Sequence, residues 1–316
     1  MSSRATLFTR FVLWLAVTVM VLLAIVVTAL RIALPQLNHF QPEIKQWASD
    51  RAGFELEIED IHGFWRNLHP SISLQGIQIH TPSSSGITFS ADRVEVELDL
   101  IQSLLELQPV VAESSLYKLN LDMTSVKLVK NQQDQPVLEP EGSQRKVIEQ
   151  LDNLLLRQLD DFSLIDSTIH LQSVDGSAIQ VDVDKLRWIN KGDRHLIDGE
   201  VGLATSNINS VLVKADFIDH GSLKDVSGEF YASVENVRVT PWLTDYLKQE
   251  TGIEKGLVSF NSWLTIERSK PVSAYLEIES SELIWQEGHR HELFIESGIF
   301  ELQPKNDGWQ VNAHSL

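Results

Sequence analysis

The sequence contains no cysteine, which excludes disulfides, thiolate metal sites, iron–sulfur clusters and cysteine nucleophiles. Cations are also scarce: 26 Lys and Arg stand against 44 Asp and Glu, a formal net charge of −18. Binding to a nucleic-acid backbone needs clustered cations, so this balance argues against a nucleic-acid partner. Hydrophobic residues nevertheless make up 43% of the chain, so the composition is not that of a disordered polypeptide.

Motifs of the common enzyme classes are missing as well. No Gly-x-Ser-x-Gly elbow, Walker loop or dinucleotide fingerprint occurs in the sequence. His289 and His291 would share one face of a strand and could bind a metal, but a solvated hairpin loop after Gly288 is the preferred interpretation. We therefore expect no catalytic residue, no metal site and no cofactor.

One long apolar run lies near the N-terminus. Residues 11–30 carry no charge, and Arg31 follows them. A helix of this length spans about 30 Å, the thickness of a bilayer core. The alternative is a cleaved signal peptide, but its apolar region is usually about 7–15 residues long and ends at small residues, unlike Ala29-Leu30-Arg31. The sequence thus predicts an uncleaved transmembrane signal anchor.

The charges beside this anchor predict its orientation. Arg4 and Arg10 precede it without an acidic residue, so the N-terminus is expected in the cytoplasm and the bulk of the chain outside it. The predicted organisation is a cytoplasmic tail (1–10), the transmembrane signal anchor (11–31), an amphipathic connecting helix (32–52) and a β-rich exported domain (53–316).

Beyond residue 53 the hydrophobic period is two, which is typical of antiparallel strands with one apolar and one polar face. Gly76 shifts the phase of this alternation by one residue and suggests a bulge. The apolar positions of these runs are the candidate lining of one continuous face. They are Phe54, Leu56, Ile58, Ile72, Leu74, Ile77, Ile79, Val94, Val96, Leu98, Leu100, Ile179, Val181, Val183, Val211, Val213, Phe217, Leu276, Ile278, Leu293 and Ile295.

Few helices are predicted beside these strands. Residues 143–161 show an amphipathic stripe of Ile148, Leu151, Leu155 and Leu159, and residues 241–249 form a second candidate. Residues 131–142 read as a linker or an exposed loop. So few helices cannot cover so many apolar strand faces, which leaves three covers: a second sheet, closure into a barrel, or a curled open sheet filled by an apolar ligand. The acidic residues opposite the apolar ones argue against a transmembrane barrel.

The order of features resembles the AsmA-like periplasmic proteins, and among them the YhdP family. The resemblance is carried by the anchor, by Ile44-Lys-Gln-Trp47, by residues 53–66, by Pro70-Ser-Ile-Ser-Leu74 and by residues 94–110. It implies a mainly β fold: an elongated, curled antiparallel sheet, or β-groove, behind the transmembrane helix. It also implies an inner-membrane protein that carries phospholipids to the outer membrane and supports outer-membrane integrity, with phospholipid, the inner membrane and envelope proteins as partners.

Two expectations concern the ends of the chain. Arg4, Arg10, Arg31, Trp47 and Trp65 are the candidate membrane-interface residues, although Trp65 fits a core position equally well and residues 35–50 could plug the end of the sheet. Because the C-terminus alternates like a strand without a cap, we expect this chain to be the first part of a longer protein. The alternative function is that of an anchored β-sandwich that assists envelope assembly without holding lipid.

Overall fold

The computed structural model describes most of the chain. The described residues are 2–52, 54–67, 69–81, 85–106, 109–130, 136–139, 142–172, 178–203, 208–238, 252–287, 289–305 and 308–315. The candidate helix 241–249 lies outside them.

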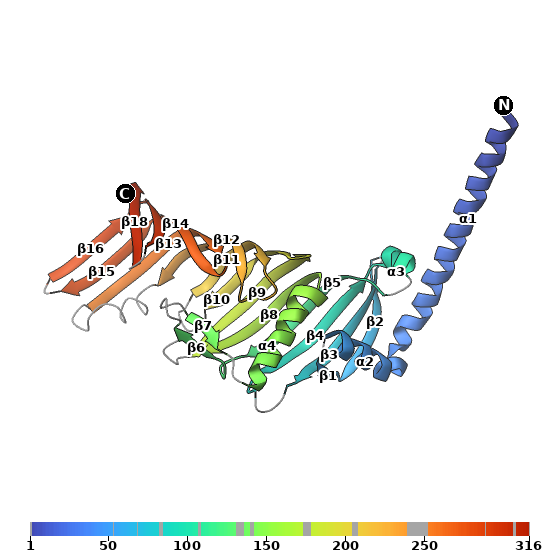
Figure 1. Cartoon of the computed structure of the whole chain (residues 1–316), viewed down its shortest axis with the longest axis horizontal. Helices are drawn as coiled ribbons and strands as arrows, with labels where there is room; N and C mark the ends of the chain where they lie inside the picture. Colours follow the sequence, from blue (N-terminus) through green and yellow to red (C-terminus); the bar gives the residue numbers. More distant parts are fainter. Residues whose placement is uncertain are drawn as a thin grey trace.

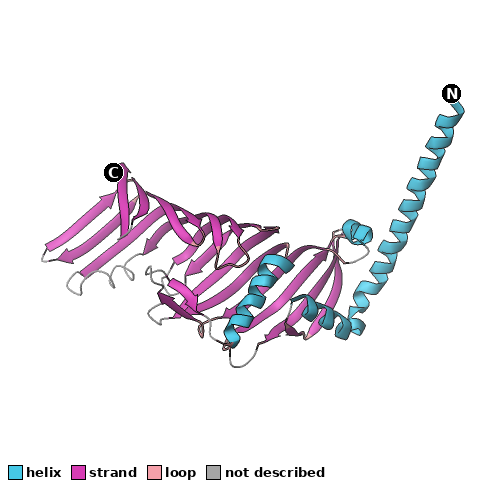
Figure 2. Cartoon of the chain, in the orientation of Figure 1, coloured by secondary structure: helices cyan, strands magenta, loops and turns pink. Residues whose placement is uncertain are grey.

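Helices are few, and most of them lie in the first half of the chain (Figure 2). They are α1 (Ser2–Ala33), the 3-10 helix η1 (Leu34–Phe40), α2 (Gln41–Ala52), α3 (Leu100–Glu106), α4 (Ser143–Asn153) and the π-helical segment η2 (Leu154–Gln158). From Arg10 onward, α1 is apolar and long enough to cross a membrane. The predicted helix 143–161 ends earlier than expected, because Asp161 already pairs as the first residue of a strand.

The strands form one 16-stranded sheet and a separate pair, β6 with β7 (Figure 1). The strands are β1 (Glu55–Glu57), β2 (Asp60–Arg66), β3 (His69–His80), β4 (Thr88–Leu98), β5 (Val111–Asp122), β6 (Lys127–Lys130), β7 (Pro136–Glu139), β8 (Asp161–Gln172), β9 (Ala178–Lys191), β10 (Arg194–Leu203), β11 (Ile208–Asp219), β12 (Val226–Arg238), β13 (Gly252–Glu267), β14 (Lys270–Ile278), β15 (Ser281–Glu287), β16 (His289–Ile295), β17 (Gly298–Lys305) and β18 (Gly308–Ser315).

The mainly β fold with one apolar N-terminal helix and an elongated sheet confirms the mainly β class, but the sheet is uncurled and does not form the curled groove that was expected. The sheet is mixed, however, because β5 and β8 pair in parallel while every other described neighbour is antiparallel. The connection between them holds β6, β7, α4 and η2. It is long enough to return the chain to the end of the sheet at which β5 begins, as a parallel neighbour requires. Residues 136–139 are therefore a strand and not part of a simple linker. Leu100, predicted at a strand end, is the first residue of α3, because β4 ends at Leu98.

A line of irregular positions crosses five strands of the sheet. Gly76, Asp92, Lys118, Asp166 and Asp184 lie opposite one another in β3, β4, β5, β8 and β9, between regularly paired neighbours. Gly76, Lys118 and Asp166 have positive φ angles of 61°, 49° and 50°. Non-glycine residues rarely adopt this conformation, so the regular strand backbone is interrupted in several strands at once. We call this line of positions, from Gly76 to Asp184, the bend.

This line changes which residues of each strand face the apolar side. In β3, Ile72 and Leu74 lie on that side before the line, and Ile77 and Ile79 lie on it afterwards. The predicted phase shift at Gly76 is confirmed, but β3 and β4 keep one register through it and contain no bulge. Because the neighbouring strands kink at the same level, no extra residue is needed. The line ends at Asp184, where β9 does have one extra residue against β10.

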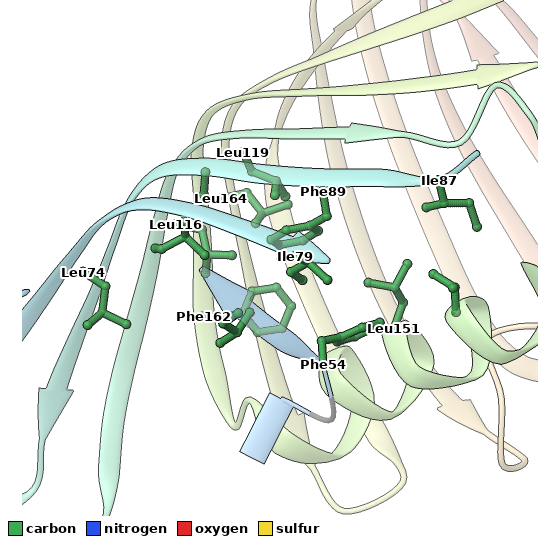
Figure 3. Close-up of a cluster of buried hydrophobic side chains, with 14 of the residues drawn as sticks. Phe54, Leu74, Ile79, Ile87, Phe89, Leu116, Leu119, Leu151, Phe162 and Leu164 are labelled. Carbon is green, nitrogen blue, oxygen red and sulfur yellow. The ribbon is translucent and has the colours of Figure 1, made fainter. Parts of the chain in front are cut away.

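Helices α2 and α4 pack on the apolar face of the N-terminal half (Figures 1 and 3). Val147, Ile148 and Leu151 of α4 are buried in one core with the strands, and Ile44 and Ala48 of α2 pack against the same core. The predicted stripe of the helix is confirmed, since Leu155 also packs there. Figure 3 shows Leu151 pointing toward the strand residues Ile79 and Phe89. This half of the face is covered by protein.

The anchor helix is joined to the sheet through β2. A methyl group placed on Gly63 would overlap the carbonyl oxygen of Leu34, so the backbones of β2 and η1 touch directly. The guanidinium carbon of Arg31 lies 5.8 Å from the centre of the half-buried Trp65 ring, a cation–π distance. Arg66, in contrast, pairs with Glu95 and Glu97. Trp65 is thus a contact between the anchor and the sheet.

Gly63→Ala is expected to loosen this junction. Overpacking of a tight contact costs about 1–3 kcal/mol, and here the obstacle is backbone, which cannot rotate away. Thermal unfolding of the full chain in detergent, followed by tryptophan fluorescence, should show a lower Tm. His62→Ala, one residue away on the exposed side of β2, is the control and should leave the Tm unchanged. Equal melting temperatures for all three proteins would contradict the tight contact.

Candidate functional site

The register of the sheet aligns apolar side chains into rows that run across the strands. The longest, the central row, has one residue from each of thirteen strands, every one directly opposite the next. Its members are Ile61, Leu74, Val94, Leu116, Leu164, Leu186, Gly199, Val213, Ala232, Ser262, Leu276, Phe300 and Ala313. Only Ser262 carries a polar side chain, and its hydroxyl donates to the carbonyl of Ala232.

Two further rows flank the central row. The second row consists of Ile72, Val96, Ser114, Phe162, Trp188, Ile197, Ala215, Phe230, Leu264, Ala274, Leu302 and Val311. The third row consists of Val183, Val201, Val211, Val234, Phe260 and Ile278. Together the three rows form a continuous apolar face along the length of the sheet.

The predicted lining residues are divided between a covered and an uncovered part of this face. Phe54, Leu56, Ile58, Leu74, Ile77, Ile79 and Val183 are buried in the core, with Ile72, Val94 and Val181 packed against it. Val211 and Val213 belong to a second, smaller core. Phe217 is buried between the rings of His195 and Phe230. Ile179, Leu276, Ile278 and Ile295 are half-buried, and Leu293 is exposed.

The C-terminal part of the face has no protein layer over it in the described chain. Val311 at the end of the second row is 57% exposed, and Leu293 on β16 is 44% exposed. Apart from the pair β6 and β7, the described strands contain no second sheet that could cover them. The face therefore changes along the molecule from a closed protein core to an open apolar surface.

The opposite face of the sheet carries charge. Residues between the row members point to this side, and they form ion pairs across neighbouring strands. Arg187 pairs with Asp161 at 2.6 Å, and Arg194 pairs with Asp216 at 2.5 Å. Charged side chains thus face water on the side that the apolar rows do not use.

A small apolar cleft lies at the end of the sheet nearest the anchor. It has a volume of about 260 Å³ between α2 and the strands β3 and β4. Its lining is Glu43, Ile44, Trp47, Ala48, Ile72, Leu74, Val96, Leu98 and Pro109. We call it the membrane-end cleft. It contains Leu74 of the central row and Ile72 and Val96 of the second row, and Trp47 at its wall is 43% exposed.

A buried polar cluster fastens η2 to the middle of the sheet. The imidazole of His195 is fully buried, with Nδ1 2.5 Å from Asn190 Oδ1 and Nε2 2.6 Å from Asp219 Oδ2. Arg157 of η2 donates to Asp219 Oδ1 at 2.5 Å. Asn190 Nδ2 donates to the carbonyl of Leu155, also in η2, at 2.6 Å. These bonds hold the end of the α4 cover against β9, β10 and β11.

The charge of Asp219 depends on these partners. Burial alone would raise the pKa of its carboxyl group, but hydrogen bonds from Arg157, His195 and the backbone N–H of Gly221 outweigh burial and hold that pKa well below its usual value. A buried Asp–His pair resembles part of a catalytic triad, but the second partner of this imidazole is the Asn190 amide oxygen and not a nucleophile. The cluster stabilises structure.

The two histidines that were considered as metal ligands lie at the start of a strand. His289 and His291 begin strand β16 and do not lie in a loop, and the His291 ring stacks on Trp285 at 5.2 Å. The described residues contain no group of three or more potential metal ligands.

The predicted lining did not include every residue of the apolar face. It lacked the helix residues Ile44 and Ala48 of the cleft. It also lacked Trp188 and Phe230, which only the register places in the second row.

Comparison with known proteins identifies relatives. The family described as "YhdP protein" matches residues 1–316. The "Intermembrane phospholipid transporter YhdP" of Escherichia coli strain K12 is 25% identical over 295 residues, which cover 92% of this chain. The match spans only 22% of that protein's length. No solved structure is significantly similar to this chain.

Asp219→Asn is expected to destabilise the protein at neutral pH. Removing one partner of a buried ion pair costs about 3–5 kcal/mol. Because the folded pKa of Asp219 is lowered, its stabilisation is complete above about pH 4, the usual Asp value, and is lost as the pH falls further. Urea unfolding of parent and variant should therefore differ strongly at pH 7 and less at pH 3.

The exposed pair of Arg194 and Asp216 provides the control. It joins the same two strands, but in water, so Asp216→Asn should cost less than about 1 kcal/mol. Equal losses for the two variants at pH 7 would contradict the assigned importance of the buried cluster.

Proposed function

Because the chain belongs to the YhdP family, we propose that it carries phospholipids between the inner and the outer membrane along its apolar face. The continuous central row carries this proposal, since it joins the membrane-end cleft to the open part of the sheet. The relative in Escherichia coli, a named intermembrane phospholipid transporter, supports it. In this role α1 spans the inner membrane with the N-terminus in the cytoplasm, and residues 53–316 lie in the periplasm.

Binding in this site is by burial of hydrocarbon. Each methylene of an acyl chain that leaves water contributes about 0.8 kcal/mol, without any directional contact. The half-buried C-terminal rows supply a matching apolar surface, and the headgroup remains in water at the edge of the sheet. The role requires no chemical step, which agrees with a site made of aliphatic and aromatic side chains.

The covered section divides the path into two parts. Leu116 and Leu164 of the central row are buried in the core that α4 helps to form. A lipid that enters at the membrane-end cleft reaches the open rows only if α4 and η2 shift. The cluster of Arg157, His195 and Asp219 opposes that shift, so we assign it the role of holding the cover closed.

Photo-crosslinking tests the apolar face directly. A photoreactive amino acid at Leu276, on the central row, should form adducts with phospholipid in cells, whereas the same residue at Glu277, on the opposite face, should not. Val96 in the membrane-end cleft and its neighbour Glu97 form a second matched pair. Mass spectrometry of the purified adducts gives the readout. Protein adducts alone, at both faces alike, would favour the scaffold alternative and contradict lipid carriage.

A charge on the apolar face should block transport. Leu276→Glu would place a carboxylate in the path of the acyl chain, where an unpaired polar group costs several kcal/mol, so transport should fall by at least about tenfold. Tyr275→Glu is the control, because Tyr275 is 38% exposed on the other face. The measurement is the rate at which labelled phospholipid reaches the outer membrane, at equal protein levels. Equal rates for the two variants would contradict the path.

A further inference from the structure

Helix α3 exposes aliphatic side chains that nothing in the described chain covers. Ile101 is 70% exposed, Leu104 is 41% exposed and Leu105 is 78% exposed. The helix contains no Lys or Arg, and Glu106 at its end is its only acidic residue. Aliphatic side chains gathered on a projecting loop, unlike single exposed ones, indicate a contact surface.

The backbone around α3 keeps these side chains away from the sheet. Asp99 Oδ1 accepts hydrogen bonds from the N–H groups of Ile101 and Gln102, both at 2.9 Å. The loop is closed at its base by the N–H of Asp99, which donates to the carbonyl of Val110 at 2.9 Å, and Ser103 Oγ accepts from the N–H of Val110 at 2.9 Å. The helix is therefore a fixed projection, and its aliphatic surface is part of the fold.

The register places α3 near the level of Arg31, which ends the uncharged run of α1. Arg31 ends the uncharged run of α1 and lies over Trp65. Trp65 is opposite Pro70, and the next pair along β3 and β4 is Ser71 with Glu97, so Pro70 and Leu98 end the sheet at this level. Helix α3 begins two residues beyond Leu98. Figure 1 shows it at the end of the sheet that faces the anchor, on the side toward which α1 rises.

We propose that α3 inserts into the bilayer surface beside α1 and forms a second membrane contact. Its partner is the phospholipid leaflet itself. The position beyond the level of Arg31 and the three exposed aliphatic side chains match an interfacial helix, which buries its apolar side by about 5–10 Å at the boundary of headgroups and acyl chains.

This second contact has a consequence for the membrane-end cleft. Leu98 and Pro109, the residues that flank the α3 loop, line the cleft. A single transmembrane helix leaves the domain free to rotate about the helix axis, whereas α1 and α3 together hold the cleft against the leaflet. The inference goes beyond lipid carriage and is independent of it, because α3 can insert whether or not the cleft takes up lipid.

Depth-dependent fluorescence quenching tests the insertion. The chain has no native cysteine, so Leu105→Cys gives one defined position for an environment-sensitive dye in the full chain. After reconstitution into vesicles of phosphatidylethanolamine and phosphatidylglycerol, nitroxide lipids should quench the dye severalfold more than aqueous iodide does. Phe294→Cys is the matched control, since Phe294 is 62% exposed on β16 at the far end of the sheet, and iodide should dominate there.

A second variant separates insertion from a folding defect. This variant carries Leu104→Glu and Leu105→Glu, with the dye attached at Ile101→Cys. Iodide should quench this dye more than it quenches a dye at Ile101→Cys in the otherwise unchanged chain. The Tm should stay unchanged, because all three side chains are exposed. Iodide quenching at position 105 equal to that at position 294 would overturn the proposal. A dye at position 105 that neither quencher reaches would also overturn it, because it would show a protein partner on α3.

Discussion

One constraint governs this structure: a wide sheet has an apolar face, and that face must be kept out of water. A small domain meets this constraint with a second sheet or a complete layer of helices. Among the described residues, α2 and α4 cover only the strands near the anchor, and no described element lies over the rows through β14, β17 and β18. The uncovered part is half-buried by its own neighbours except at exposed positions such as Val311 and Leu293, and the lipid that we propose as its ligand would complete the burial.

The bend from Gly76 to Asp184 makes this face possible. In a regular strand, alternate residues would keep one apolar set on one side for the full length. At the bend the set changes from Leu74 to Ile77 in β3 and from Leu116 to Leu119 in β5, so the same side of the sheet remains apolar on both sides of it. Lys118 and Asp166 accept an unfavourable backbone conformation there, and the ion pair of Lys118 with Asp92 at 3.1 Å joins two of the kinked strands.

Alternation in the sequence was sufficient to predict the fold class and most strand residues, because the period of two is a local property. Leu74, Val94, Val213 and Leu276 were all assigned to the apolar face in this way, and the register places them in one row. Pairing is not local, however. Nothing near Leu116 shows that β5 meets β8 in parallel, and nothing near Val183 shows that α4 closes over one part of the face and not over Leu276. The cleft needed α2 as its second wall, and the cluster at Asp219 joins residues more than sixty positions apart.

The central row is regularly spaced as well as apolar. Neighbouring strands in a sheet are about 4.8 Å apart, so the row repeats a similar aliphatic environment at each such step. Beyond the section that α4 and η2 cover, a chain molecule lying along the row can advance by one strand and find similar contacts, with no deep minimum to hold it and no high barrier to cross. Such a surface has little selectivity for position, and it favours travel over residence.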